Sequence, residues 1–342
     1  MSNRNKNLLY SAILIGLMFL VYLYRKQTAL PKEIYVQGTT MGTTPYNIKY
    51  LDEQQRNFKE EIDKVLKEFN QSLSTYIPDS EISKFNKNDS LTYESHYFYP
   101  VLDRSKMVYE RTQGAFDPTV MPLVKAWGFG PGKTPQEMTQ AKVDSLLQLV
   151  GFQYISYDKK TVRKSKNNVE LDFSAIAGGY ASDLVAELLL EKGIENFMVE
   201  IGGEVVCRGT NSKGEIWSIG IENPVVAEEG GKEISSIIRL ENKALATSGN
   251  YRNFYIKDGK KYAHTLDPKT GYPVEHSLLS ATVVAKDCMD ADAYATAFMV
   301  MGVEKSIDFL KQNTDIQALL IYDEGGKMKI FMTEGLKEYV VK

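Results

Sequence analysis

Two side chains in the segment 290–296 are spaced so that they could bind a cation together. Asp292 and Thr296 are four positions apart, so on a helix they lie on one face, one turn from each other. A carboxylate and a hydroxyl are hard oxygen ligands of the kind that Mg²⁺ prefers. The same spacing also fits a threonine that only hydrogen-bonds the carbonyl of Asp292. Both interpretations stay open, and a magnesium site would need a third ligand from elsewhere in the chain.

His264 is a candidate proton acceptor, because a neutral imidazole can take a proton from a hydroxyl near pH 7. It is one of only three histidines in the chain. The turn signal Asp258-Gly259 predicts a hairpin of strands 251–257 and 261–264, which would bring Arg252 near His264. A histidine at a strand end that only hydrogen-bonds the backbone is the alternative, and the sequence leaves it open.

The segment 171–180 (LDFSAIAGGY) predicts a loop of small residues that enters a helix. Its glycines allow a ligand to approach the backbone closely, and the first amides of a helix favour anions. The segment matches neither G-x-G-x-x-G nor a Walker A motif, so it does not support a standard dinucleotide or P-loop site. Close packing of the helix on a sheet would explain the same glycines.

The composition of the whole chain is that of a globular protein. Of 342 residues, 43% are hydrophobic and 25% are charged, which excludes a disordered, collagen-like or multi-span membrane protein. The net charge of −3 disfavours a nucleic-acid binder, which usually has a basic excess. Two cysteines, Cys207 and Cys288, are too few for a disulfide scaffold. Whether they are buried thiols or a pair stays open.

The amino-terminal part of the chain differs from this average. Leu8 to Tyr24 contains 17 residues without a charge, and as a helix it would extend about 26 Å, enough for a thin hydrocarbon core. No A-x-A-like site and no cysteine follows it. We therefore expect an uncleaved transmembrane anchor and tether over residues 1–33, with the globular part exported. A cleaved signal peptide is the alternative.

The expected anchor and the rest of the chain carry net charges of opposite sign. Residues 1–33 carry five basic side chains and one acidic side chain, a net charge of +4, which leaves −7 for residues 34–342. An acidic domain cannot hold a phosphorylated ligand by massed positive charge. A metal ion or backbone amides would have to supply the attraction.

Residues 34–342 predict one compact, two-lobed α+β domain with mixed β-sheets and packed helices. The strands come in blocks with helices between the blocks, which is not typical of regular βαβ winding. Helices are expected at 53–72, 100–112, 180–192, 291–301 and 303–312, and a further one is expected to begin at the capping box Thr134, Pro135 and Glu137. Strands are expected at 34–36, 46–50, 197–201, 205–208, 216–221, 234–240, 251–257, 280–285, 318–322 and 328–332.

Taken together and in this order, the motifs resemble the ApbE family, the FAD:protein FMN transferases. The resemblance is carried by MGTTPYNI (41–48), LSTYIPDSEISKFN (73–86), GAFDPTVMPLVKAWGFG (114–130), DFSAIAGGYASD (172–183), VEIGGEV (199–205), ATSGNYRNF (246–254), HTLDPKTGYPV (264–274) and DADAYATAFMVMG (290–302). The elements H-x-L-D-P-x-T-G and A-D-A-x-A-T-A are the most specific of these.

The resemblance implies an Mg²⁺-dependent enzyme that splits the pyrophosphate of FAD. It would leave FMN on a Thr or Ser hydroxyl of a partner protein through a phosphoester and release AMP. The implied acceptor is an extracytoplasmic redox subunit, and no nucleic acid is involved. The resemblance and the anchor together predict a protein of the bacterial inner (cytoplasmic) membrane, with its catalytic domain on the periplasmic side.

The resemblance also implies roles for individual positions. The carbonyl of Ala175 would be the missing third metal ligand beside Asp292 and Thr296, and His264 would be the base near the acceptor hydroxyl. The residues that would contact FAD are Met41, Tyr76, Ala115, Phe116, Asp117, Asp172 and Leu266.

One position departs from the family pattern. Family members commonly read A-K-G where this chain has Ala177-Gly178-Gly179, so Gly178 would contact FAD only through its backbone. The missing lysine removes a cation near FAD, which would weaken FAD binding or favour hydrolysis. The alternatives are therefore an FAD pyrophosphatase that yields FMN and AMP, and a non-catalytic periplasmic FAD-binding protein.

Overall fold

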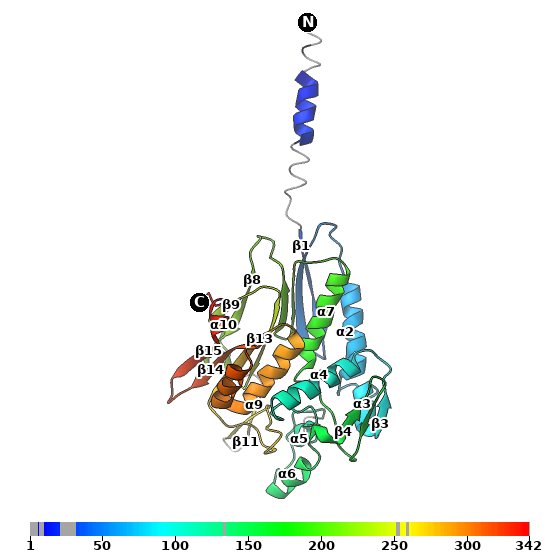
Figure 1. Cartoon of the computed structure of the whole chain (residues 1–342), viewed down its shortest axis with the longest axis vertical. Helices are drawn as coiled ribbons and strands as arrows, with labels where there is room; N and C mark the ends of the chain where they lie inside the picture. Colours follow the sequence, from blue (N-terminus) through cyan, green and yellow to red (C-terminus); the bar gives the residue numbers. More distant parts are fainter. Residues whose placement is uncertain are drawn as a thin grey trace.

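The computed structural model describes Lys6 and residues 10–20, 32–132, 135–250, 254–257 and 260–341. A helix covers residues 10–20 and precedes the folded body (Figure 1). None of the helices within the described ranges has the length and apolarity needed to cross a membrane. The expected anchor, Leu8–Tyr24, lies only partly within these ranges.

An eight-stranded sheet forms the centre of the fold, in the order β1-β2-β6-β7-β10-β13-β14-β15 (Figure 1). Alternate residues of its second strand, Tyr46, Ile48 and Tyr50, are fully buried, as the two-residue period of a strand requires. All pairings between described strands are antiparallel, so the expectation of mixed sheets was wrong, whereas the α+β class is confirmed. The strands are β1 (Lys32–Thr40), β2 (Thr44–Asp52), β6 (Phe197–Ile201), β7 (Glu204–Arg208), β10 (Lys243–Gly249), β13 (Leu278–Ala285), β14 (Gln317–Asp323) and β15 (Met328–Met332).

Both faces of this sheet are covered. Long helices pack on one face, where Phe69 and Leu66 of α2 and Leu189 of α7 join the largest hydrophobic cluster. The β8–β9 hairpin and α10 cover the other face around Trp217 and Leu336. The covering elements are α2 (Lys59–Leu73), α7 (Ala177–Glu191) and α9 (Cys288–Gln312) on the first face, and β8 (Trp217–Glu222), β9 (Ile234–Leu240) and α10 (Glu334–Lys337) on the second. Helix α4 (Phe98–Arg111) packs on α9.

Shorter elements complete the body. Trp127, Leu123, Val150 and Leu266 form a third, small cluster near α5 and α6. The β11–β12 pairing places Lys257 opposite Lys260, which confirms the expected hairpin, although its turn and Arg252 lie outside the described residues. The remaining elements are α3 (Glu81–Lys87), β3 (Ser90–Thr92), α5 (Met121–Ala126), α6 (Gln140–Leu147), η1 (Phe152–Tyr154), β4 (Ile155–Tyr157), β5 (Thr161–Lys164), α8 (Pro224–Glu228), β11 (Phe254–Lys257) and β12 (Lys260–Ala263).

The capping-box prediction was wrong. Helix α6 begins at Gln140, and its N-cap is Thr139, whose side chain accepts a hydrogen bond from the Lys142 amide. The expected N-cap, Thr134, lies outside the described residues. Pro135 packs closely on Gly128: a Cβ atom added to this glycine would be only 2.8 Å from the proline. The Gln136 amide donates a hydrogen bond to the Ala126 carbonyl. These contacts with the end of α5 hold the segment in a non-helical conformation.

The predicted break in the last long helix is confirmed. Gly302, with φ of 75°, is non-helical and divides α9 into two helical segments at the point expected between 291–301 and 303–312. Helix α9 begins three residues earlier than expected, at Cys288. Cys288 and Cys207 are both buried free thiols.

Candidate active site

Asp292 lies where the amino ends of α7 and α9 meet. One of its carboxylate oxygens accepts a hydrogen bond of 2.9 Å from the Gly179 amide, in the first turn of α7. Asp292 is only 7% exposed, and burial raises the pKa of its carboxyl while the Gly179 and Gly178 amides oppose that rise. Among the described ion pairs, none involves Asp292. Helix amides therefore hold a buried carboxylate at this junction.

The other two expected metal ligands belong to the same junction. Ala175 directly precedes Ile176, the N-cap of α7, so its carbonyl is not one that the helical hydrogen-bond pattern uses. Thr296 lies one turn beyond Asp292, and its hydroxyl is 3.2 Å from that of Ser248 in β10. In the described part of the chain no group of three or more His, Cys, Asp or Glu is placed to hold a metal. A metal site here would have to use hydroxyl and carbonyl oxygens.

The segments around Asp117 and Asp172 lie side by side. The Asp172 amide donates to the Pro118 carbonyl at 2.7 Å, and burial raises the pKa of Asp172. Asp117 accepts hydrogen bonds from both the amide and the hydroxyl of Thr119, at 2.8 and 2.6 Å. Ala115, Phe116 and Asp117 are 6%, 3% and 7% exposed. Their side chains support the loop from within, so the loop presents mainly backbone to a ligand.

A chain of contacts joins Tyr76 to His264. The Tyr76 hydroxyl is 3.4 Å from the Phe129 carbonyl oxygen, and the ring of Phe129 stands edge-on to the His264 imidazole at 6.4 Å between centroids. Nearby Asp172 adds to burial in raising the pKa of Tyr76. Tyr76 is 58% exposed, which is unusual for a large aromatic side chain and fits a surface that a planar ligand would cover.

The segment that follows His264 is fixed against the same region. Leu266 is buried at 6% exposure and pairs with Pro273. The Trp127 indole donates to the Gly271 carbonyl at 2.9 Å. Gly114, in the loop before Asp117, lies close to Lys269, since a Cβ atom added to this glycine would be 3.8 Å from the lysine side chain. These contacts bring the predicted residues of 114–117 and 264–266 to one side of the molecule.

Met41 and Gly178 come from different elements, the β1–β2 turn and the first turn of α7. Met41 occupies the β1–β2 turn with φ of 46°, and Asn70 of α2 donates to the neighbouring Thr40 at 2.9 Å. The carboxylate of Glu204 lies over Gly178. A Cβ atom added to Gly178 would be 2.8 Å from a carboxylate oxygen of Glu204. An acidic side chain therefore lies beside the position where the sequence resemblance led us to expect a lysine.

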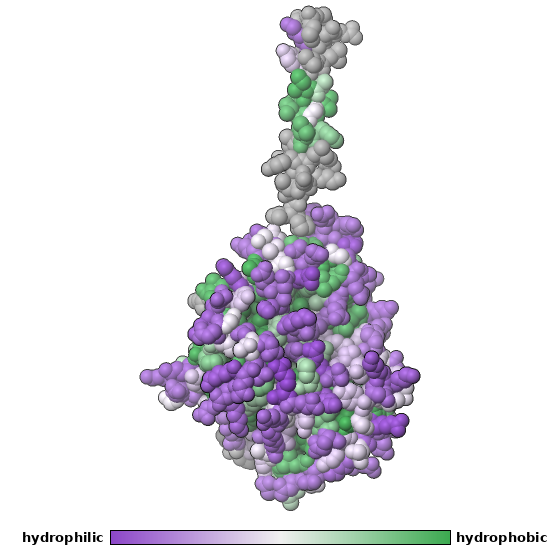
Figure 2. Space-filling model, in the orientation of Figure 1, coloured by the Kyte–Doolittle hydropathy of each residue, from purple (hydrophilic) through white to green (hydrophobic). Residues whose placement is uncertain are grey.

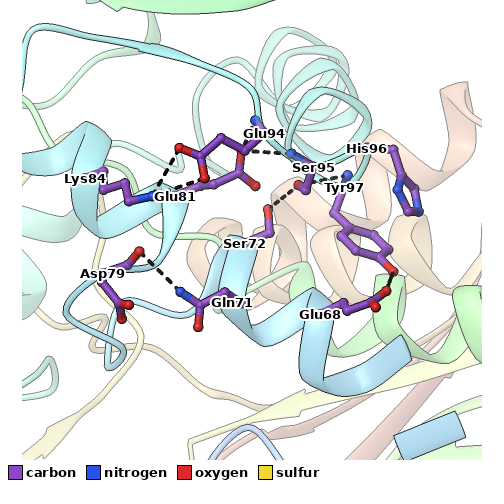
Figure 3. A pocket seen from close by; sticks show the side chains of 10 residues that line it. All are labelled: Glu68, Gln71, Ser72, Asp79, Glu81, Lys84, Glu94, Ser95, His96 and Tyr97. Atoms are coloured by element: carbon purple, nitrogen blue, oxygen red, sulfur yellow. Dashed lines mark hydrogen bonds and ion pairs between the residues drawn. The ribbon is translucent and has the colours of Figure 1, made fainter. Parts of the chain in front are cut away.

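A separate pocket lies between α2, α3 and the segment before α4 (Figure 3). Glu81 accepts the Glu94 and Ser95 amides there, and Lys84 pairs with Glu94 at 3.1 Å. None of the predicted site residues lines this pocket. With four carboxylates and one lysine it does not suit an anionic diphosphate. Its lining residues are Glu68, Gln71, Ser72, Asp79, Glu81, Lys84, Glu94, Ser95, His96 and Tyr97.

Known proteins share both the sequence and the fold of this chain. The family model described as "ApbE family" matches residues 41–320. The chain belongs to the ApbE family. A FAD:protein FMN transferase of Haemophilus influenzae is 37% identical over 334 residues, which is 94% of this chain and 95% of that protein. The solved flavin transferase ApbE of Vibrio cholerae has a TM-score of 0.82 at 35% identity and covers 90% of this chain and 99% of its own. The apo flavinyl transferase ApbE of Pseudomonas stutzeri has a TM-score of 0.81 at 33% identity, over 90% of this chain and 97% of its own.

ApbE membership leaves the role of each residue to the geometry, and the geometry adds residues that sequence reasoning missed. Ser248 contacts Thr296, Phe129 lies between Tyr76 and His264, and Glu204 covers Gly178. All three lie in segments that carry the resemblance to the ApbE family. Their presence in these segments was the available signal, but only the fold shows their neighbours.

The buried carboxyls predict an unusual dependence of stability on pH. Burial raises the pKa of Asp117 to about 6 and that of Asp183 to about 7. A carboxyl whose pKa is higher in the folded than in the unfolded chain binds protons more tightly when folded, so protonation stabilises the fold. Without divalent cations, we expect the free energy of unfolding to rise by about 2 to 4 kcal/mol from pH 7.5 to pH 5.

Urea denaturation at the two pH values measures this change. Asp52 and Asp315 have a pKa below the usual value of 3.8. They stay ionised between pH 7.5 and pH 5, so they do not contribute to this change in stability. Asp117→Asn keeps an acceptor for Thr119 and should reduce the rise by about 1 kcal/mol. A stability that falls toward pH 5 would contradict the expectation.

Proposed function

We propose that this chain transfers the FMN moiety of FAD to a Thr or Ser hydroxyl of a partner protein and releases AMP. The observation that carries the proposal is the junction of α7 and α9, where the Gly179 amide holds the buried carboxylate of Asp292. Thr296 follows one turn later on α9, and Ala175 directly precedes the N-cap of α7. Family membership over most of the chain supports it. In this reaction the acceptor oxygen bonds to the FMN phosphorus as the bond to the AMP phosphate breaks.

Mg²⁺ is the proposed metal, and the residues present fit it. The donors would be the Asp292 carboxylate, the Thr296 hydroxyl and the Ala175 carbonyl, all hard oxygens. The buried carboxylate has amide donors but no cationic side chain among the described ion pairs, so a bound cation would offset its charge. When bound, Mg²⁺ would neutralise the diphosphate charge that grows during transfer.

The chain's own residues would perform the remaining steps. His264 would take the proton of the acceptor hydroxyl, which is otherwise a weak nucleophile. The amides at the start of α7 would favour the anionic diphosphate. Tyr76 offers an exposed ring for stacking on the isoalloxazine, with Asp172 and the loop 115–117 beside it.

Membrane attachment is part of the proposal. The helix over residues 10–20 exposes apolar side chains, which appear as a green segment above a largely hydrophilic body (Figure 2). Ile15 and Leu20 are 64% and 62% exposed. Burial of this surface in a bilayer would remove its contact with water. We place the catalytic domain on the periplasmic side of the bacterial inner membrane, where an extracytoplasmic redox subunit is the acceptor.

One assay separates the proposed activity from its alternatives. Full-length protein in detergent is mixed with FAD, Mg²⁺ and an acceptor subunit that carries a Thr or Ser site. Fluorescent flavin that stays on the acceptor through denaturing electrophoresis supports transfer. AMP release without labelling supports the second candidate, an FAD pyrophosphatase, which the Gly178–Glu204 contact favours. Unchanged FAD would contradict both activities and leave a binding protein.

The contact of Gly178 with Glu204 makes a prediction about FAD binding. Gly178→Lys places a cation beside the diphosphate region, and the Glu204 side chain can move to admit it. We expect the Kd for FAD to fall about tenfold, because a charge-assisted hydrogen bond contributes roughly 1.5 to 3 kcal/mol. Titration of FAD by its fluorescence measures this.

Gly178→Ala is the matched control, because it moves Glu204 without adding charge. An equal gain in both variants would assign the effect to Glu204 and not to the cation. Weaker FAD binding by Gly178→Lys would contradict the prediction.

A further inference from the structure

We propose that Asp183 is a positioning residue for the metal site, because it fixes the first turn of α9 against α7. Asp183 lies in the second turn of α7, five residues after Gly178. The inference rests on the proposed function, since the residues it positions are Asp292 and Thr296.

Asp183 supplies the cap that α9 lacks in its own sequence. One carboxylate oxygen accepts the Cys288 amide at 2.9 Å, and the other accepts the Met289 amide at 2.8 Å. The first amides of a helix have no partner within the helix. The N-cap residue Asp287 makes no side-chain capping bond, so a side chain from another helix caps α9.

The two helices hold each other reciprocally. The Gly179 amide of α7 donates to Asp292 of α9 at 2.9 Å, while two amides of α9 donate to Asp183 of α7. The backbones touch between these bonds, since a Cβ on Gly179 would be 2.2 Å from the Cys288 carbonyl oxygen. We name this set of contacts (Asp183, Cys288, Met289, Gly179 and Asp292) the α7–α9 clasp.

The clasp determines where the metal ligands lie. Asp292 lies one helical turn after Cys288, and Thr296 lies two turns after it. The position and rotation of the first turn of α9 therefore determine where both side chains lie. Loss of the Asp183 bonds would leave the Gly179–Asp292 bond as the remaining hydrogen bond of the clasp. The metal ligands would then be free to shift relative to Ala175, at the other side of the site.

The hydrogen-bond partners of the Asp183 carboxylate are backbone amides, although other charged side chains lie nearby. Burial raises the pKa of Asp183 to about 7, and Asp287 and Glu187 add to the rise. Arg104 of α4 makes its ion pairs with Asp290 and Asp287, at 2.5 and 3.7 Å. A carboxylate that is buried among other acids and bonded to two amides fixes a backbone position.

The test compares Asp183→Ala and Asp183→Asn with Asp287→Asn in the full-length protein. Asp287→Asn removes a charge from the same helix end without removing an amide acceptor, so it is the matched control. Asp183→Asn keeps one acceptor oxygen and nearly the same shape. Hydrogen exchange of residues 288–296 is measured without metal, and magnesium affinity is measured from the thermal shift that magnesium chloride produces.

We expect faster exchange in both Asp183 variants. The magnesium concentration for half-maximal shift should rise about tenfold or more in Asp183→Ala, because residues that orient metal ligands typically contribute 10- to 100-fold in affinity. Asp183→Asn should lie between Asp183→Ala and wild type. Asp287→Asn should match wild type, and the KM for FAD at saturating magnesium should stay unchanged in every variant.

Two outcomes separate this inference from the proposed function. No magnesium response in the wild type would contradict the proposed metal and the metal role of Asp183 together. A normal wild-type response with unchanged exchange and affinity in the Asp183 variants would overturn the role of Asp183 alone. An equal loss in Asp287→Asn and Asp183→Ala would also overturn it, since charge at the helix end would then be the cause.

Discussion

Asp292→Ala should reduce the rate of FMN transfer by about 10³-fold or more, at saturating FAD and magnesium. The variant loses the only carboxylate among the three proposed metal ligands. Metal stabilisation of a transferring phosphoryl group contributes several kcal/mol, and about 1.4 kcal/mol corresponds to each factor of ten in rate. Initial rates of AMP release and of acceptor labelling measure the effect.

The fold of this variant should persist, because the two hydrogen bonds from the Cys288 and Met289 amides to Asp183 still join α7 to α9. Asp290→Asn is the matched control: Asp290 lies two residues away on α9 and faces Arg104 of α4 at 2.5 Å. Its rate should stay within a few-fold of wild type. Full activity of Asp292→Ala would exclude the proposed metal site.

His264→Ala should lower transfer to the acceptor protein by about 10²- to 10⁴-fold, the range that a general base contributes. FAD binding and magnesium binding should be unchanged, because the proposed metal ligands lie on α9 and just before the N-cap of α7. The measurement is labelling of the acceptor at saturating FAD, with the Kd for FAD determined separately.

His96→Ala is the control for the loss of an imidazole. His96 lines the separate acidic pocket and lies against Tyr97, with 4.0 Å between the ring centroids, so its loss should not affect labelling. Normal labelling by His264→Ala would exclude His264 as the base. A parallel loss of FAD affinity would make His264 a binding residue instead.

The residue pattern predicted helix α2 well because it has a strong apolar period. Helix α2 carries Ile62, Leu66 and Phe69 on its buried face, and this period was sufficient to place it. Strand β10 was missed because its sequence, KALATSG, is small and weakly apolar. Its position at the centre of the sheet comes from its neighbours, β7 and β13, and not from its own composition.

In the candidate site too, some residues could be found from the local sequence and others only from the fold. Asp292 and Thr296 could be paired from their spacing alone, because one helix carries both. Ala175 came only from the family resemblance, since a backbone ligand leaves no mark in the residue type. Ser248 and Asp183 needed the fold, because each acts across a gap of 48 or 105 residues that no local pattern spans.

The order of the strands has a consequence for how the chain folds as it is made. The spatial order of the main sheet, from β1 to β15, is also the order of these strands in the chain, and in Figure 1 the colours pass from blue to red across it. Each new strand therefore meets a neighbour that has already been synthesised. Since amino-terminal parts generally fold first during synthesis, the sheet can grow in one direction, strand by strand. The α7–α9 clasp forms late in this sequence, because α9 follows six of the eight strands.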